Sequence, residues 1–202
     1  GYGALNENTT ATDNTAVGRL ALRYNTTASN NTAIGSLALT ANTTGTNNVA
    51  VGGNALDANT TGNHNAGLGT QALGANTTGT GNTGVGTFSL DANTTGGYNT
   101  GLGYGSLGAN VNGLQNTAVG AFALDANTSA SYNTAVGYES LTTVTTAQNN
   151  TAVGHSSLKA NTSGSENVAV GTYALLSNTT AANNTAVGYY TFCLLYTSPS
   201  PR

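Results

Sequence analysis

The apolar positions of this chain recur every 17 residues, a period far longer than that of a strand or a helix. The stretch Asn14–Gly18 reads NTAVG, and the same five residues begin again at Asn116, Asn133, Asn150 and Asn184. Near-copies fill the positions between them, so eleven copies follow one another without insertion or deletion. The consensus unit is N-T-A-V-G-x-x-A-L-x-x-N-T-T-G-x-x, and its positions are numbered 1 to 17 below. Such strict repetition predicts that each unit forms one coil of a stack.

Positions 2 to 4 of each unit predict a short strand. Position 4 is always Val, Ile or Leu, and position 9 is Leu in every unit from Leu5 to Leu175. In a strand, positions 2 and 4 share one face, while the Ala or Gly of position 3 points the other way. We therefore expect positions 4 and 9 to form the core, and the small-residue face of position 3 to lie against another backbone. The expected core residues are Val17, Leu22, Ile34, Leu39, Val51, Leu56, Val119, Leu124, Val136, Leu141, Val153 and Leu158.

Two columns of the repeat are the same residue in all eleven copies. The Gly of position 5 predicts a bend with φ > 0, where other residues are penalised sterically. The Asn of position 1 would hydrogen-bond from coil to coil as a ladder, as amides do in cross-β assemblies. The expected ladder residues are Asn14, Asn31, Asn48, Asn65, Asn82, Asn99, Asn116, Asn133, Asn150, Asn167 and Asn184. The expected turn residues are Gly18, Gly35, Gly52, Gly69, Gly86, Gly103, Gly120, Gly137, Gly154, Gly171 and Gly188.

A helical repeat is disfavoured, because Gly, Asn and Thr crowd every unit and a pair of helices needs about 33 residues. We predict an all-β fold, a parallel β-solenoid in which 17 residues close one coil and the coils stack at about 4.8 Å. The N-T-T-G segment is expected to form a second turn. Residues 1–192 then make a single solenoid domain of one partial unit, ten full units and a truncated last unit.

The period ends at Phe192, and residues 193–202 read CLLYTSPSPR. This segment holds the only Cys and both Pro residues, and it resembles the in-frame translation of a transposon-type sequencing adapter. We expect a non-native, disordered tail, and a repeat array truncated at both ends. No other Cys is available for disulfides within the coils.

The composition indicates a thin core and few charged partners. Two sizeable apolar side chains per 17 residues offset little of the entropy lost in ordering a coil. We therefore expect an obligate oligomer, a homotrimer, associating through the small-residue face. Only 5% of residues are charged, and three cations, Arg19, Arg23 and Lys159, precede the tail, so we expect no nucleic-acid partner. No apolar run approaches the ~20 residues of a membrane helix, so we expect no membrane insertion by this segment.

No combination of residues predicts a catalytic, cofactor-binding or metal site. The stretch Gly103–Gly108 matches G-x-G-x-x-G, but it is one repeat unit without the following helix that a dinucleotide site needs. His64 and His155 fall in different columns, and the repeat does not offer a Ser–His–Asp arrangement. We expect both histidines at the surface.

Two polar columns have competing interpretations. Position 10 is Asp in alternate units, at Asp57, Asp91 and Asp125, which predicts a spacing of roughly 10 Å and favours solvated turn residues over a metal site. Position 12 begins an N-T-T or N-T-S acceptor in nine units, which favours a turn column over glycosylation. Val144 breaks this column without breaking the period.

Tyrosines concentrate at two positions of the repeat. Tyr104, Tyr138 and Tyr189 directly follow the invariant Gly, and Tyr98 and Tyr132 precede an invariant Asn. A packing role at an edge is favoured over stacking on sugar rings.

The tandem N-x-A-[VI]-G-x-x-[AS]-L units resemble the head repeats of YadA-type trimeric autotransporter adhesins. They resemble more closely the N-T-A-[VI]-G-x-x-A-L-x-x-N-T-T-G arrays of phage and bacterial tail-fibre-like proteins. The resemblance covers residues 1–192 and implies a left-handed, YadA-head-like β-roll with three chains side by side. It also implies an extracellular location, on a bacterial cell surface or a phage virion. The YadA head unit is shorter, so its coil shape does not transfer directly, and its repeats supply no catalytic residues.

The leading hypothesis is a structural and adhesive shaft of a trimeric fibre, a bacterial adhesin head or a phage tail fibre, without catalysis or cofactor. Its expected partners are further copies of itself and a host-surface glycan or protein receptor. The alternative is an ice-binding β-solenoid. Flat ice-binding faces usually carry two Thr files, whereas position 2 supplies a single one. A polysaccharide-cleaving solenoid would need paired carboxylates, which the scattered acids disfavour.

Overall fold

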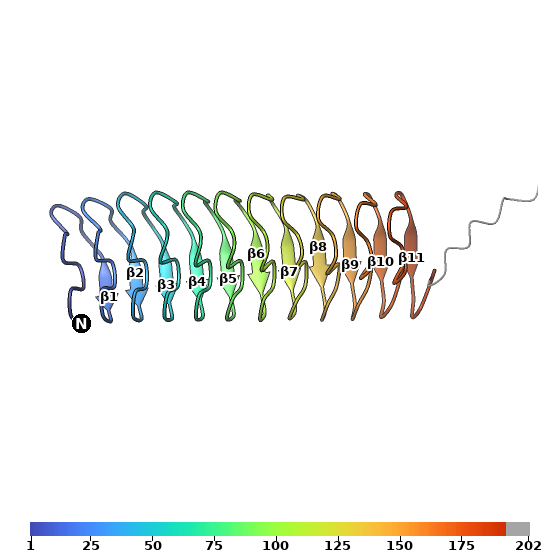
Figure 1. The fold of residues 1–202 in the computed structure, drawn as a ribbon, viewed down its shortest axis with the longest axis horizontal. Helices are drawn as coiled ribbons and strands as arrows, with labels where there is room; N and C mark the ends of the chain where they lie inside the picture. The colour runs from blue at the N-terminus through green and yellow to red at the C-terminus, as the bar shows by residue number, and fades with distance from the viewer. Residues whose placement is uncertain (193–202) are drawn as a thin grey trace, which may run out of the picture.

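The computed structural model describes residues 1–192, and within them it contains eleven parallel strands and no helix (Figure 1). The predicted all-β solenoid with 17-residue coils is confirmed. The expected disordered tail at 193–202 lies outside the described residues. The strands are β1 (Thr15–Val17), β2 (Thr32–Ile34), β3 (Val49–Val51), β4 (Ala66–Leu68), β5 (Thr83–Val85), β6 (Thr100–Leu102), β7 (Thr117–Val119), β8 (Thr134–Val136), β9 (Thr151–Val153), β10 (Val168–Val170) and β11 (Thr185–Val187).

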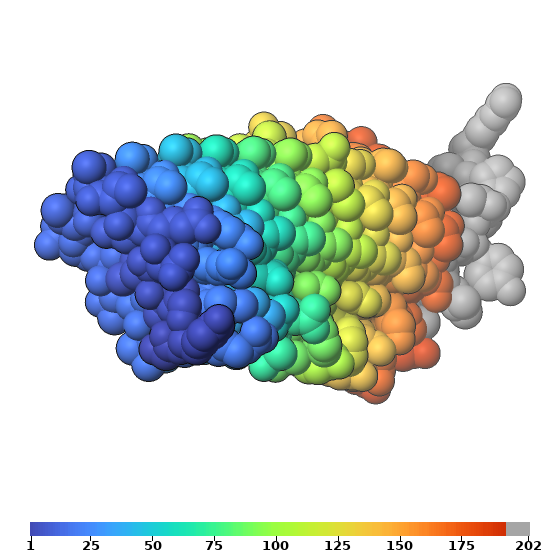
Figure 2. All heavy atoms as spheres, turned by 60° about the vertical axis from the view of Figure 1, so that its left-hand side comes forward, coloured from blue at the N-terminus to red at the C-terminus, as the bar shows by residue number. Residues whose placement is uncertain are grey.

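The strands form one sheet in sequence order, from β1 to β11. Thr15 pairs with Thr32, Ala16 with Ala33, and Val17 with Ile34, and the same register continues to β11. Like residues therefore lie above one another in files along the rod. At the usual strand spacing the stack is roughly 50 Å long. Figure 2 shows the coils as successive parallel bands from the N-terminal end.

Behind each strand, positions 6 to 11 return as a run of tight turns. The turns place leucines in the left-handed region, with φ of 58° at Leu20 and 51° at Leu22. Such values are uncommon for residues other than Gly, Asn and Asp. The backbone N–H of Leu22 donates to the carbonyl of Ala38 in the next coil at 3.1 Å, so coil-to-coil hydrogen bonds hold the return segment as well as the strands.

The core is built from positions 3, 8 and 9 rather than from positions 4 and 9. The leucines of position 9 in the coils after the first are fully buried, among them Leu22, Leu39, Leu56, Leu124, Leu141 and Leu158. The expectation for position 4 was wrong, because these side chains point away from the core. Two of the expected core residues at this position are exposed and four are only partly buried: Val17, Ile34, Val51, Val119, Val136 and Val153.

The narrow interior explains this correction. The buried file of the sheet is the Ala or Gly of position 3, including Ala33 and Ala50. A Cβ placed on Gly67 would lie 3.4 Å from Cγ of Leu56, so the wall facing each Leu has room for a methyl group and little more. The small-residue face is therefore turned into the core and cannot serve as the association surface that the sequence suggested.

The Gly of position 5 forms the corner at the end of each strand. All eleven of these glycines have φ between 126° and 140°. Stacking adds a second constraint, since a Cβ on Gly103 would lie 2.7 Å from the carbonyl group of Gly120 in the next coil. The column excludes every other residue both by backbone conformation and by the close approach of the neighbouring coil.

The Asn of position 1 forms an unbroken ladder inside the rod. The backbone N–H of Asn31 donates to Oδ1 of Asn14 at 2.9 Å, and this is the first of ten such bonds that continue up to Asn184. Nδ2 of Asn31 donates to the carbonyl of Gly45, across the same coil, at 2.9 Å. The ladder thus ties each coil to the next, and nine of its eleven asparagines also close the second turn of their own coil in this way.

A second ladder, at position 12, was missed by the sequence analysis. Nδ2 of Asn42 donates to Oδ1 of Asn25 in the previous coil and to the carbonyl of Gly45, both at 2.9 Å. The asparagines of this column from Asn25 onward are fully buried, so in the folded chain their amides are not accessible as glycosylation acceptors. The signal for burial was Val144, because an apolar residue replacing Asn in an otherwise constant column indicates an interior site.

Candidate functional site

The most distinctive surface of the rod is the outer side of the sheet, formed by positions 2 and 4 of β1 to β11. We call it the Thr/aliphatic face. Position 2 is Thr in eight of the eleven strands and position 4 is Val, Ile or Leu in all of them. Because the strands are in register, the side chains form two straight files at strand spacing.

This face carries no charge, since none of the strand residues is ionisable, and its position 4 file is aliphatic throughout. The aliphatic file remains accessible along its length, with Val17 56% and Val187 67% exposed at its ends and Leu102 exposed in its middle. The face measures roughly 50 Å by 10 Å, or about 500 Å². A continuous accessible row of aliphatic side chains along such a face is the kind of apolar feature that marks interaction surfaces in soluble proteins. Sequence reasoning missed this site because it assigned the aliphatic file to the core.

The acidic column of position 10 lies half-buried beside the return segment. Burial raises the pKa of Asp57, Asp91 and Asp125, and repulsion from Asp57 adds to the rise at Asp91. A hydrogen bond from Nδ2 of Asn54 at 3.1 Å partly offsets the effect at Asp57. The Oδ1 atoms of Asp57 and Asp91 lie 3.7 and 2.9 Å from the point where Gly74 would carry a Cβ, so these carboxylates lean toward each other across that coil.

The remaining candidate residues do not assemble into a reactive centre. His64 and His155 are exposed and lie in different coils, and His155 stacks on Tyr138 with ring centroids 5.5 Å apart. Among residues 1–192 no group of three or more His, Cys, Asp or Glu side chains could hold a metal ion. Gly103 forms a coil corner and Gly108 lies beside Asp125, so the G-x-G-x-x-G match has no phosphate-binding geometry.

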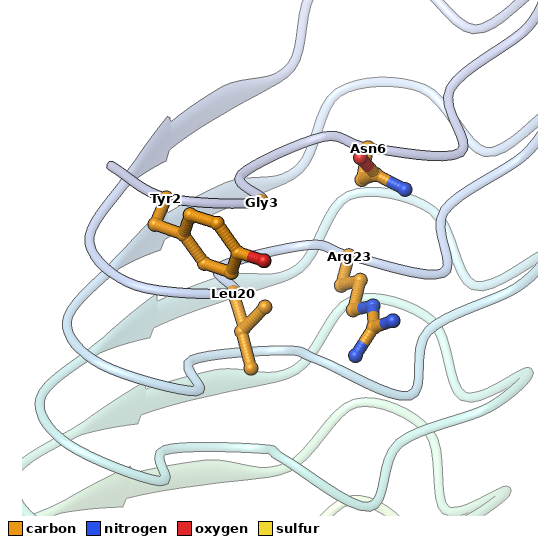
Figure 3. Close-up of a pocket in the computed structure, with 5 residues that line it drawn as sticks. All are labelled: Tyr2, Gly3, Asn6, Leu20 and Arg23. Atoms are coloured by element: carbon orange, nitrogen blue, oxygen red, sulfur yellow. The ribbon is translucent and has the colours of Figure 1, made fainter.

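A pocket opens at the N-terminal end of the rod, where it is lined by Tyr2, Gly3, Asn6, Leu20 and Arg23 (Figure 3). These residues occupy positions 6, 7 and 10 of the first two coils. The pocket contains one cation and no carboxylate, and therefore no acid–base pair.

The fold and surface define the class of this protein: a parallel β-solenoid whose interior holds two asparagine ladders beside its leucine file, and whose sheet carries an outward-facing aliphatic file. No protein-family model, curated protein or solved structure matches the chain. In residues 1–192 no helix is long and apolar enough to cross a membrane.

Proposed function

We propose that this chain is the shaft of a surface-exposed fibre, in which three copies pack through their Thr/aliphatic faces and present an adhesive outer surface. In this proposal the coils wind left-handed, as in the adhesin heads that the repeats resemble. The fibre projects from a bacterial cell or a phage virion, and it has no catalytic activity.

The observation that carries this proposal is the position of the aliphatic file. A single coil buries one Leu and a few small residues, which is little apolar area per 17 residues. The largest aliphatic side chains of the strands are left outside instead. Packing three such faces together would remove them from water and add the core that a single rod lacks.

The test is sedimentation of the full chain beside two variants. Val119→Lys with Val136→Lys places two cations in the middle of the face, while Ser129→Lys places one on an exposed turn away from it. We expect a trimer for the unchanged chain and for Ser129→Lys, and a β-rich monomer for the double variant. A well-folded monomer of the unchanged chain at micromolar concentration would overturn the proposal.

Ice binding remains the second candidate, supported by one observation. The Thr file of position 2 lies on the outer face, in register from coil to coil and beside the aliphatic file of position 4, so the rod presents a regularly spaced, uncharged outer surface. Thermal hysteresis measured on the same samples separates the candidates. The fibre proposal expects none in the trimer, whereas a monomer with hysteresis that Val119→Lys and Val136→Lys abolish would favour ice binding.

A further inference from the structure

A continuous row of aromatic rings runs along a different edge of the rod, at positions 6 and 7. It begins in the coil of β5 and contains a ring in every coil through that of β11, with neighbouring ring centroids 5.1 to 6.3 Å apart. We call this row the aromatic track. Its members are Phe88, Tyr104, Phe122, Tyr138, His155, Tyr173, Tyr189 and Tyr190.

The fold itself does not require these rings. The coils of β1 to β4 close in the same register with residues such as Arg19, Ser36, Asn54 and Gln71 at positions 6 and 7. Yet the track holds seven of the chain's thirteen Tyr and Phe residues, which number ten and three. Such a concentration in half of the rod indicates a role beyond closing the coil.

The track combines exposed ring surface with hydrogen-bonding groups. Tyr104 is 49% and Tyr138 46% exposed, although His155 stacks on one face of Tyr138. Phe122 lies between the two tyrosines, is partly buried and meets both edge-to-face. The Phe122 ring and Oδ1 of Asp125 both border the space above Gly105, at 3.2 and 3.9 Å from the point where it would carry a Cβ. The Asp125 carboxylate has no hydrogen bond or ion pair to any residue in the described part of the chain, so it is free to accept one.

We propose that the aromatic track binds an extended, neutral β-linked polysaccharide, whose sugar rings stack on the exposed tyrosines while Asp125 accepts hydroxyl groups. The C–H face of a sugar ring complements the negative face of an aromatic ring, and the Tyr hydroxyls stay available to its polar rim. Tyr104 and Tyr138 lie two coils apart, roughly 10 Å. That spacing is close to the disaccharide repeat of an extended β-1,4-linked chain.

The charges along the track favour a neutral polymer over a basic polypeptide. Glu139 is paired with Lys159 at 2.6 Å, and this pairing lowers the pKa of Glu139. Asp91 and Asp125 are the carboxylates left without an ion pair beside the described rings of the track. Two carboxylates along roughly 30 Å provide little attraction for a polycation once salt screens them.

The inference deepens the proposed adhesive role by naming a ligand class. It rests on the proposed function only in requiring the track to face outward from the fibre.

To test the inference, the full chain is run in native gels with hydroxyethylcellulose, a neutral β-1,4-glucan, and is titrated with cellohexaose. Tyrosine fluorescence reports on the rings directly, because the chain has no Trp. We expect retardation in the gel and saturable quenching in the titration.

The decisive variant is Tyr104→Ala with Tyr138→Ala, since Ala already occupies position 6 at Ala121. It should weaken binding about tenfold, the effect of losing two stacking contacts. The matched control is Tyr98→Asn with Tyr132→Asn. It removes two tyrosines that lie away from the track and are more exposed than Tyr104 and Tyr138, and it introduces the residue found at position 17 in other coils. The control should bind as the unchanged chain does, and Asp125→Ala should weaken binding about threefold.

Three results would overturn the inference: no binding by the unchanged chain, full binding by the Tyr104 and Tyr138 variant, or equal loss in the control. Binding of poly-lysine in place of the glucan would also overturn it, in favour of a basic partner. The same titration on the Val119→Lys, Val136→Lys chain separates the two proposals. If the unchanged chain is a trimer but neither chain binds the glucan, the fibre proposal is supported and the ligand inference is refuted. If the chain is a monomer that binds the glucan, the ligand inference is supported and the fibre proposal is refuted.

Discussion

Replacing Asn99 with Val should destabilise the rod far more than replacing Asn93 with Val, although both asparagines are fully buried. Nδ2 of Asn99 donates to Oδ1 of Asn82 at 3.2 Å and to the Gly113 carbonyl at 2.7 Å. Its Oδ1 accepts the backbone N–H of Asn116 at 3.0 Å and Nδ2 of Asn116 at 3.1 Å. The substitution removes all four bonds and leaves the buried N–H of Asn116 without its acceptor.

The size of the effect follows from which groups keep a partner. The Gly113 carbonyl still accepts from Asn110 at 3.3 Å, Oδ1 of Asn82 still accepts the backbone N–H of residue 99 at 3.0 Å, and Nδ2 of Asn116 still donates to Ala130 at 2.8 Å. The three lost bonds whose remaining groups keep another partner cost about 0.5 kcal/mol each, and the backbone N–H of Asn116, which has no other partner, costs about 2 kcal/mol. We expect Asn99→Val to lower the free energy of unfolding by about 3–4 kcal/mol.

Asn93→Val removes three bonds of the second ladder but leaves no donor without a partner. Oδ1 of Asn76 loses its bond from Nδ2 of Asn93, and we expect it to accept a nearby backbone N–H instead, as Oδ1 of Asn127 does beside Val144. Nδ2 of Asn93 donates to Asn76 and Gly96, and its Oδ1 accepts from Asn110, which keeps its bond to the Gly113 carbonyl. We expect a loss of about 1–1.5 kcal/mol.

The chain already contains this replacement at Val144, which is fully buried. Beside it, Oδ1 of Asn127 accepts the N–H of Ala130 at 3.1 Å in place of the missing side-chain amide. The second ladder can therefore re-pair locally around an apolar residue.

The assay is urea unfolding followed by circular dichroism, with hydrogen exchange of the Asn116 amide as a local readout. Repeat arrays need not unfold in two states, so the midpoint and the local protection are compared rather than an extrapolated energy. Asn99→Val should lower the midpoint more and should abolish protection at Asn116. Equal midpoints for the two variants, or a larger loss for Asn93→Val, would refute the assignment of the backbone donor to Oδ1.

Gly103→Ala should lower the free energy of unfolding by several kcal/mol, because Gly103 has a φ of 135° and the new Cβ would lie 2.7 Å from the carbonyl group of Gly120. Gly84→Ala, whose Cβ would lie 3.2 Å from the Ser89 carbonyl oxygen, should be tolerated in the same urea unfolding experiment. Burial raises the pKa of Asp57, Asp91 and Asp125, so the folded chain holds their protons more tightly than the unfolded chain does. The stabilisation that protonation of these carboxyl groups gives the fold should therefore be complete below their ordinary pKa of 3.8, and it should be lost as the pH rises through their folded pKa values. Changing all three to Asn should remove this part of the pH dependence of the urea midpoint, and an unchanged profile would contradict it.

The repeat period was enough to predict the coil length, the parallel register and the strands, because each follows from residues that recur at fixed positions. Val17 shows where that reasoning stopped. Strand alternation puts positions 2 and 4 on one side and position 3 on the other, but it does not say which side is inside. The larger size of the valines suggested that position 4 faces the interior. The Leu on the opposite wall, however, leaves room at the sheet for no side chain larger than Ala. The width of the cavity is set by the return segment, and the αL turns at Leu20 and Leu22 that determine it have no distinctive sequence signal.

The sequence analysis identified only some residues of the aromatic track. Tyr104 and Tyr138 stood out because they follow the invariant Gly. Phe88, Phe122 and Tyr173 are one position further along their units, so no single column contained the whole row. The structure joins them because positions 6 and 7 of adjacent coils are within ring-to-ring contact.

This rod buries two files of polar asparagines and leaves a file of aliphatic side chains accessible at its surface. This arrangement links its stability to its proposed role. Two files of buried amides bond along the stack, as in Asn31 to Asn14 and Asn42 to Asn25, so each coil is held by its neighbours through directional bonds rather than by a thick apolar core. Hydrogen bonds of this kind fix the register but contribute modestly to net stability. The aliphatic side chains that would ordinarily supply the rest, such as Val119 and Val136, face outward. In the fibre proposal, a chain built in this way reaches its full stability when those faces meet. The proposed self-association would therefore follow from how the core is made, and it would leave the aromatic track, on another edge, available for the proposed ligand.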